Sequence, residues 1–170
     1  MINIYVDADS SPVKNEAVRV AERYGLKVYF VSNNPRMRIP EYKLVERIVV
    51  NGELDAADDW IVEHVTENDI VVSADIPLVS RCIKREARVL DPRGRVFTEE
   101  SIGDVLSRRD IMTFLRDTGN RDTVSRAPAY DKRDRSRFLE RLDDLIQAIR
   151  RAGENNTGNP STDSSIQKAG

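Results

Sequence analysis

Two aspartates, Asp7 and Asp9, stand one residue apart in the stretch YVDADSSPVK, directly after a short apolar run. Two carboxylates this close repel each other, and the nearest basic side chain in the stretch is that of Lys14. Either the acids cap the helix that follows, at about 0.5–2 kcal/mol for each cap, or a cation holds them together. Two further stretches, GELDAADDWI and VVSADIP, carry acids of the same kind: Asp55, Asp58, Asp59 and Asp75.

Carboxylates with no histidine or cysteine beside them offer hard oxygen ligands, which favour Mg²⁺ or Mn²⁺ over zinc. Such an ion polarises a phosphoryl oxygen and lowers the pKa of a bound water for in-line attack. The chemistry that these acids would support is therefore the hydrolysis of phosphate esters, provided that the fold brings them together.

Strand-like and helix-like segments alternate through the first hundred residues. Strands are expected at 2–7, 27–32, 43–50 and 69–75, with a short one in 88–94, and helices at 12–25, 56–68 and 76–87. Pro12 fits the first turn of the first helix, with Ser10 or Ser11 as its cap. This alternation predicts an α/β fold, a doubly wound and mostly parallel sheet with helices on both faces. Strand carboxyl ends and helix amino ends then share one edge, where all three acidic groups belong.

The pattern changes after residue 98. The sequence predicts one bent helix or two short ones over residues 98–119, and a loop over 118–130. It predicts an amphipathic helix over 131–152, whose apolar stripe is expected to pack against the rest of the domain. Residues 153–170 offer almost nothing to bury and are expected to be disordered. We therefore expect one domain over residues 1–150, with a helical carboxyl-terminal extension (98–150) and a disordered tail (153–170).

Composition and charge restrict the function further. The single cysteine, Cys82, excludes an internal disulfide and a multi-cysteine zinc site, and it reads as a small core residue. No apolar run approaches the ~18 residues of a membrane span, and acids come too early for a secretory signal, so a cytoplasmic protein without membrane contact is expected. Residues 1–107 hold 14 basic and 19 acidic residues, whereas 108–151 hold 12 and 8. This asymmetry suits a protein that holds cations in its body and polyanions elsewhere.

Several motifs resemble, in order and spacing, those of the bacterial YaiI/YqxD family of uncharacterised proteins. They are VDADSSPVK, GELDAADDWI, VVSADIPLVSRCI and VLDPRG, followed by SRRDIMTFLRDTG and DKRDRSRFLERL, and together they cover roughly residues 2–145. That family is grouped with the PIN-domain-like fold, whose members are typically Mg²⁺- or Mn²⁺-dependent nucleases. The resemblance implies Asp7, Asp9, Asp58 and Asp75 as metal ligands, with Asp55 and Asp59 as further candidates, and Asp7, Asp9 and Asp75 as the catalytic acids. The nuclease activity itself is an analogy from the fold grouping.

One position departs from the family pattern, which usually reads Asp-Ala-Asp-Ala-Cys-Pro. Here Ser10 and Ser11 stand where alanine and cysteine would be. A serine hydroxyl is a poor substitute for a nucleophilic or metal-binding thiol, whereas a small cap before Pro12 would be served equally well. The departure favours the carboxylates as the chemistry.

Three functions remain open on this reading. The leading one is metal-dependent phosphodiester hydrolysis, with RNA as the substrate, in which Lys14, Arg36, Arg38 and the basic segment 121–141 engage phosphates. The second is a non-catalytic nucleic-acid-binding or regulatory protein whose acids are structural caps. The third is a phosphatase of the haloacid-dehalogenase type, with Asp7 as the nucleophile and Asp9 as the acid/base. The stretch DADSS matches the motif of that class only in part.

Overall fold

The computed structural model describes the backbone of residues 1–53, 55–117 and 129–157, and the side chains of 1–53, 55–108 and 129–155. Its elements follow in the order β1 (Asn3–Asp7), α1 (Lys14–Tyr24), β2 (Lys27–Ser32), β3 (Val45–Val49), α2 (Ala56–His64), β4 (Ile70–Val72), α3 (Ile76–Lys84), β5 (Arg88–Leu90), β6 (Val96–Phe97), α4 (Glu99–Asp117) and α5 (Lys132–Thr157).

The strands form one six-stranded sheet in the order β3-β2-β1-β4-β5-β6. The first four pairings along this order are parallel, and the last, between β5 and β6, is antiparallel. The doubly wound, mostly parallel sheet predicted from the alternation of elements is confirmed. The sequence did not predict β6, because two residues are too few to show a periodic pattern.

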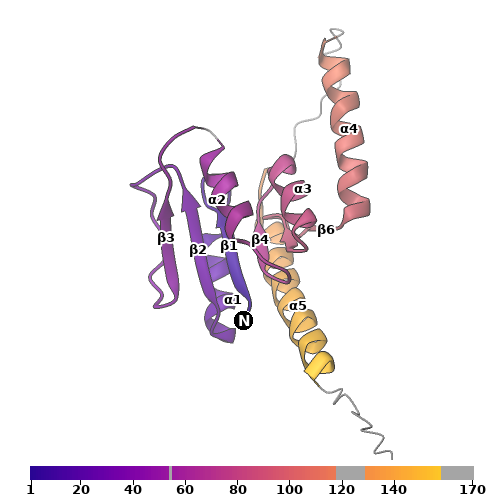
Figure 1. The fold of residues 1–170 in the computed structure, drawn as a ribbon. Helices are drawn as coiled ribbons and strands as arrows, with labels where there is room; N and C mark the ends of the chain where they lie inside the picture. The colour runs from indigo at the N-terminus through magenta and orange to yellow at the C-terminus, as the bar shows by residue number, and fades with distance from the viewer. Residues whose placement is uncertain (54, 118–128, 158–170) are drawn as a thin grey trace, which may run out of the picture.

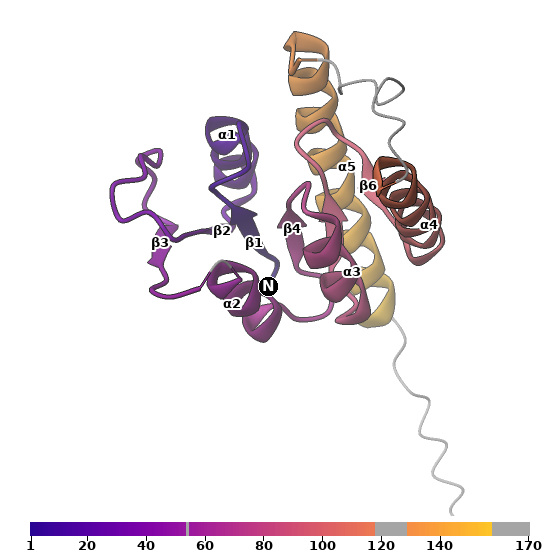
Figure 2. The ribbon, with the colours of Figure 1, turned by 90° about the horizontal axis from the view of Figure 1, so that it is seen from above.

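Alternating side chains of the central strands build two separate cores, one on each face of the sheet. Ile4 and Val6 of β1 belong to the cluster beneath α1 and α5, whereas Tyr5 belongs to the cluster beneath α2 and α3. This alternation follows from the pleat of a strand, whose successive side chains point to opposite faces. Figures 1 and 2 show the resulting layers, with α1 and α5 on one side of the sheet and α2 and α3 on the other.

The start of α1 differs from the expectation. Val13 occupies the N-cap position, no side chain caps the helix, and Pro12 precedes the first turn. The predicted serine cap is therefore wrong: the Ser10 hydroxyl donates a hydrogen bond to Asp7 Oδ2 at 2.8 Å, and the Ser11 hydroxyl has no partner within the described residues. The end of α1 follows the sequence signal, since Gly25 adopts the left-handed conformation, with φ of 65°.

The helical extension proves to be part of the core. Residues 99–117 form the single helix α4, and the expected loop at 118–130 lies largely outside the described residues. Helix α5 begins with Asp131 and Asp134 each accepting the other's backbone N–H, at 3.0 Å, and it runs to Thr157 rather than ending at 152. Its buried stripe completes the cluster on the α1 side of the sheet: Phe138, Leu142, Ile146 and Ile149. The rest of the expected tail, 158–170, lies outside the described residues.

None of the described helices has the length and the apolar character that a membrane span requires. The thiol of Cys82 is fully buried between α3 and the sheet, as expected of a small core residue.

The turn between β5 and β6 fits closely against α5 at Gly94. This residue has a φ of 87°, and a Cβ placed on it would lie 2.7 Å from the backbone carbonyl carbon of Arg137. Both the left-handed conformation and the lack of space therefore require glycine.

We predict that Gly94→Ala lowers the free energy of unfolding by roughly 2–4 kcal/mol, because backbone strain adds to a contact that backbone atoms cannot relieve. Urea unfolding followed by circular dichroism measures this change. Gly103→Ala in α4 is the matched control, since a Cβ there meets nothing within 4 Å, and its stability should stay equal or rise. Equal stability of the two variants would contradict the close fit.

Candidate functional site at the carboxyl edge of the sheet

The strand order reverses direction between β1 and β4, and ligands of doubly wound sheets bind at this point, outside the carboxyl ends of the strands. Asp7 is the last residue of β1, and Ser73 directly follows β4. Because Val6 pairs with Val72 in parallel register, the two residues come next to each other. The buried Ser73 hydroxyl donates a hydrogen bond to Asp7 Oδ2 at 3.1 Å across the reversal point.

A pocket of about 560 Å³ opens at this edge. Its lining comes from four connections: Asp7, Asp9 and Ser10 after β1, Asn33 after β2, Asp55, Ala57 and Asp58 before and within α2, and Ala74 and Asp75 after β4. Five carboxylates from three segments that are distant along the chain thus share one small volume.

The first pair of acids caps no helix. Asp7 is 7% exposed and accepts hydrogen bonds on Oδ2 from Ser10 and Ser73. Asp9 accepts one hydrogen bond from the Ser32 hydroxyl and another from the backbone N–H of Asn33, at 3.1 Å. Since α1 has no side-chain cap, the capping explanation fails for both residues.

The remaining acids divide into different environments. Asp75 is a true cap of α3, accepting from the backbone N–H of Leu78 at 3.3 Å. Asp55 sits at the N-cap position of α2, yet its side chain makes no capping hydrogen bond. Asp59, a candidate ligand from the sequence, is not part of the pocket lining and instead forms an exposed ion pair with Arg81 at 2.8 Å. The structure therefore assembles Asp7, Asp9, Asp55, Asp58 and Asp75, and leaves Asp59 apart.

The assembled charges perturb one another. Partial burial, followed by the charges of Asp75, Asp7 and Asp55, raises the pKa of Asp58 to about 6. Burial raises the pKa of Asp7 as well, with smaller upward contributions from Asp75 and Asp9, while hydrogen bonds from Ser10 and Ser73 oppose the shift. A cluster of this kind is unfavourable when fully ionised, and perturbed acids in a cleft are typical of functional sites.

The donor set suits a hard divalent cation in chemistry and charge, because the pocket offers carboxylate, amide and hydroxyl oxygens. The side chains as placed do not yet form a coordination shell: within the described ranges, no three Asp, Glu, His or Cys residues are grouped as a metal ion would need. Asp9 and Asp75 are occupied by hydrogen bonds to other groups. A metal would therefore have to draw these carboxylates inward.

The basic residues expected to bind phosphate lie outside this pocket. Lys14 opens α1, and Arg36 and Arg38 lie in the loop after β2, whose first residue, Asn33, does line the pocket. Within the basic segment 121–141, residues 121–128 lie outside the described part of the chain. The sequence did not predict a role for Ser32, Asn33 or Ser73. A serine at the end of a buried apolar strand was the signal that could have revealed Ser32 and Ser73.

Ser11, the residue that replaces the cysteine of the family motif, is 4% exposed and is absent from the pocket lining. Its hydroxyl has no hydrogen-bond partner among the described residues. A weakly polar thiol would suit this environment better than a hydroxyl, so the structure gives this position a packing role.

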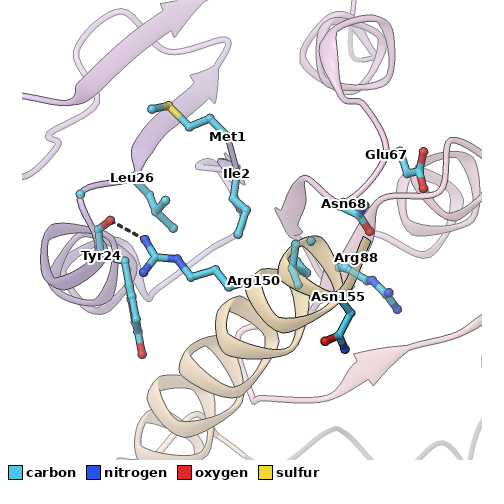
Figure 3. Close-up of a pocket in the computed structure, with 13 residues that line it drawn as sticks. Met1, Ile2, Tyr24, Leu26, Glu67, Asn68, Arg88, Arg150 and Asn155 are labelled. Carbon is cyan, nitrogen blue, oxygen red and sulfur yellow. Dashed lines mark hydrogen bonds between the residues drawn. The ribbon is translucent and has the colours of Figure 1, made fainter. Parts of the chain in front are cut away.

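A larger groove, of about 940 Å³, lies at the opposite edge of the sheet, between the amino ends of the strands and the end of α5 (Figure 3). Its lining mixes apolar groups such as Ile2 and Leu26 with dispersed charges, and Arg150 donates to the backbone carbonyl oxygen of Tyr24 at 3.0 Å. The groove carries one acid, Glu67, whereas the pocket at the carboxyl edge carries five.

Fold and pocket together define a doubly wound α/β protein with an acidic site at its topological reversal point. The sequence model of a family described as "Uncharacterized BCR, YaiI/YqxD family" matches residues 5–148. The chain belongs to this family, as the motifs predicted.

Curated relatives are similar over nearly their full length. The UPF0178 protein of Parvibaculum lavamentivorans is 51% identical over 151 residues, which cover 89% of this chain and 97% of the relative. The UPF0178 protein of Nitrobacter winogradskyi is 50% identical, with 89% and 94% covered, and that of Rhodospirillum centenum is 48% identical, with 89% and 99% covered. No solved structure matches the chain.

We predict that Asp58→Asn stabilises the protein at pH 7.5 by about 1–2 kcal/mol, allowing for solvent screening. The folded-state pKa of Asp58 is raised, so its ionised form opposes folding above about pH 6, and this penalty disappears as the pH falls towards 4. The gain of the variant over the wild type should shrink accordingly in urea unfolding measured from pH 7.5 to pH 4.5 in the presence of a chelator. Asp59→Asn is the matched control, because it removes the adjacent charge outside the pocket. A gain that does not depend on pH would contradict the crowding of charges.

We also predict that Ser11→Ala or Ser11→Cys leaves the protein equally stable or more stable by about 1 kcal/mol, since each removes a buried hydroxyl without a partner. Ser32→Ala provides the comparison: the hydroxyl of Ser32 is fully buried and bonded to Asp9 and to the backbone N–H of Asn34. That variant should lose about 1 kcal/mol. Melting temperatures of the three variants test the difference, and a loss for Ser11→Ala comparable to that for Ser32→Ala would mean that Ser11 has a partner.

Proposed function

We propose that this protein is a Mg²⁺- or Mn²⁺-dependent phosphodiesterase that acts on RNA. The observation that carries the proposal is the convergence of five carboxylates, from three separate segments of the chain, on one pocket at the reversal point of the sheet. Capping explains only Asp75 among them. Carboxylates that raise one another's pKa values in a pocket whose described lining holds no basic side chain are best explained by a cationic ligand.

Each acid has a distinct part in this proposal. Asp7, Asp9, Asp58 and Asp75 would hold the ion, with Asp55 beside them. Asp7 is the best-positioned of these residues, because Ser10 and Ser73 bind its Oδ2 and no described residue donates to its Oδ1. The bound ion would polarise the phosphoryl group and activate a water. The two serines would keep the Asp7 carboxylate in one orientation, which reduces the cost of organising the site.

Two arguments support RNA as the substrate. The PIN-domain-like grouping of the family supports nuclease chemistry by analogy. The excess of basic residues over 108–151 supports a polyanionic substrate through its charge. In metal-dependent cleavage of RNA, the acids hold the ion and a cationic surface binds the phosphate backbone of the substrate.

We predict that the protein cleaves a labelled single-stranded oligoribonucleotide with 1 mM Mn²⁺, and that Asp7→Asn reduces the rate by about 100-fold or more. Mn²⁺ should also raise the melting temperature of the wild type, since a ligand at a hundred times its Kd stabilises by about 2.7 kcal/mol. Asp7→Asn should abolish this rise. Asp59→Asn, which leaves the pocket intact, should preserve both cleavage and the thermal shift.

Other results would identify the alternatives. Salt-sensitive RNA binding without cleavage, unaffected by a chelator, would indicate a binding protein with no catalysis. Hydrolysis of small phosphomonoesters, together with trapping of Asp7 by beryllofluoride, would indicate the phosphatase. Absence of a Mn²⁺-dependent thermal shift in the wild type would contradict the metal site directly.

A further inference from the structure

Four arginines from two segments line a second pocket at the carboxyl edge. The pocket has a volume of about 610 Å³, and its lining is Asp91, Arg93, Gly94, Arg95, Val96, Arg137 and Arg141. The first five residues belong to the turn after β5 and the first residue of β6, and the last two belong to α5. We call this pocket the arginine groove.

The acid that lines the groove, Asp91, accepts hydrogen bonds from the backbone of the turn. Asp91 Oδ1 accepts the backbone N–H groups of Arg93 and Arg95, at 2.9 and 2.8 Å. The Asp91 carbonyl oxygen accepts the N–H of Gly94 at 3.0 Å, and the Asp91 N–H donates to the Arg95 carbonyl oxygen at 2.9 Å. Asp91 therefore fixes the shape of the turn that presents Arg93 and Arg95.

The two walls of the groove are held at a set distance. Gly94 packs against the backbone of α5 at Arg137 with no room for a Cβ. The buried carboxylate of Asp134 accepts from Arg93 at 3.2 Å and from Arg137 at 3.5 Å, bridging the turn and the helix. Arg95 lies over the ring of Phe97, with 5.1 Å between its guanidinium carbon and the ring centroid. Such preorganisation lowers the entropy cost of binding a rigid anion.

The arginine groove begins close to the acid pocket. Ser73, whose hydroxyl binds Asp7, donates its backbone N–H to the carbonyl oxygen of Leu90 at 3.1 Å. Leu90 directly precedes Asp91 in the groove. Strands β1, β4 and β5 are successive neighbours, so two strand spacings, about 10 Å, separate the ends of β1 and β5. Helix α5 lines the groove and helix α2 lines the acid pocket. These two helices cover opposite faces of the sheet (Figure 2), so a ligand in both pockets would cross the carboxyl edge.

We propose that the arginine groove binds the backbone phosphates of single-stranded RNA and holds the strand whose phosphodiester enters the acid pocket. This proposal rests on the proposed function for its substrate. Guanidinium groups match phosphate geometry, and four of them on a fixed frame favour a chain of phosphates over a single one. Arg93 and Arg137 form ion pairs with Asp134 and so also organise the groove. Arg95 and Arg141 add positive charge and do not pair with Asp134.

The test uses the double variant Arg95→Gln/Arg141→Gln, which leaves both ion pairs of Asp134 in place. Binding of a fluorescent single-stranded oligoribonucleotide is measured by anisotropy in a chelator, over a series of salt concentrations. Loss of two phosphate contacts should weaken binding at least ten-fold at low salt. It should also reduce the magnitude of the slope of log K against log[salt] by about 1.4.

The matched control is Lys84→Gln/Arg88→Gln, which removes two exposed charges at the opposite edge of the sheet, at the end of α3 and the start of β5. This variant should retain the affinity and the slope of the wild type. Equal losses in both double variants, or no loss in Arg95→Gln/Arg141→Gln, would overturn the groove as the RNA site, as would a wild type that does not bind RNA.

The two proposals fail in different ways. RNA binding that Arg95→Gln/Arg141→Gln weakens, without Mn²⁺-dependent cleavage of the RNA, would support the groove as the RNA site and overturn the phosphodiesterase activity. Cleavage that depends on Asp7 but not on Arg95 and Arg141 would support the phosphodiesterase and overturn the groove.

Discussion

Crowding of like charges at the carboxyl edge of the sheet is the constraint on which the candidate site depends. Parallel pairing places the ends of β1 and β4 side by side, and the hydrogen bond from Ser73 to Asp7 joins them. Helix α2 then brings Asp58 into the same pocket, where its ionisation is disfavoured. A fold optimised only for stability would replace some of these acids by neutral residues. Acids gathered in one pocket in this way are typical of a site where stability is given up for binding.

The sequence predicted the frame of this site well, and its fine geometry poorly. Strand and helix periods were enough to predict the parallel sheet, and the sheet was enough to place the acids at one edge. The phase of α2 was not predictable: Asp58 and Asp59 are about 100° apart around the helix, and only packing decides that the first faces the pocket and the second faces Arg81. The serine cap of α1 failed for a related reason, because Ser10 bonds Asp7, a contact that depends on the fold of the loop.

The two pockets of the carboxyl edge divide opposite charges between the two faces of the sheet. Carboxylates gather on the α2–α3 side, and arginines gather where the β5–β6 turn meets α5. The sequence showed this asymmetry only as an excess of acids in the first part and of bases in the last. Distance along the chain concealed the proximity of Asp91 to Ser73, since it arises from the pairing of β4 with β5.

The position of α5 has a consequence for the newly made chain. Phe138, Leu142, Ile146 and Ile149 cover apolar side chains of β1 and α1, which are made first. A chain is synthesised at ~5–20 residues per second, so the part of this face that α5 covers stays exposed until residues 132–157 have left the ribosome. During that interval the nascent polypeptide exposes apolar side chains of β1 and α1, and completion of this core depends on the synthesis of α5.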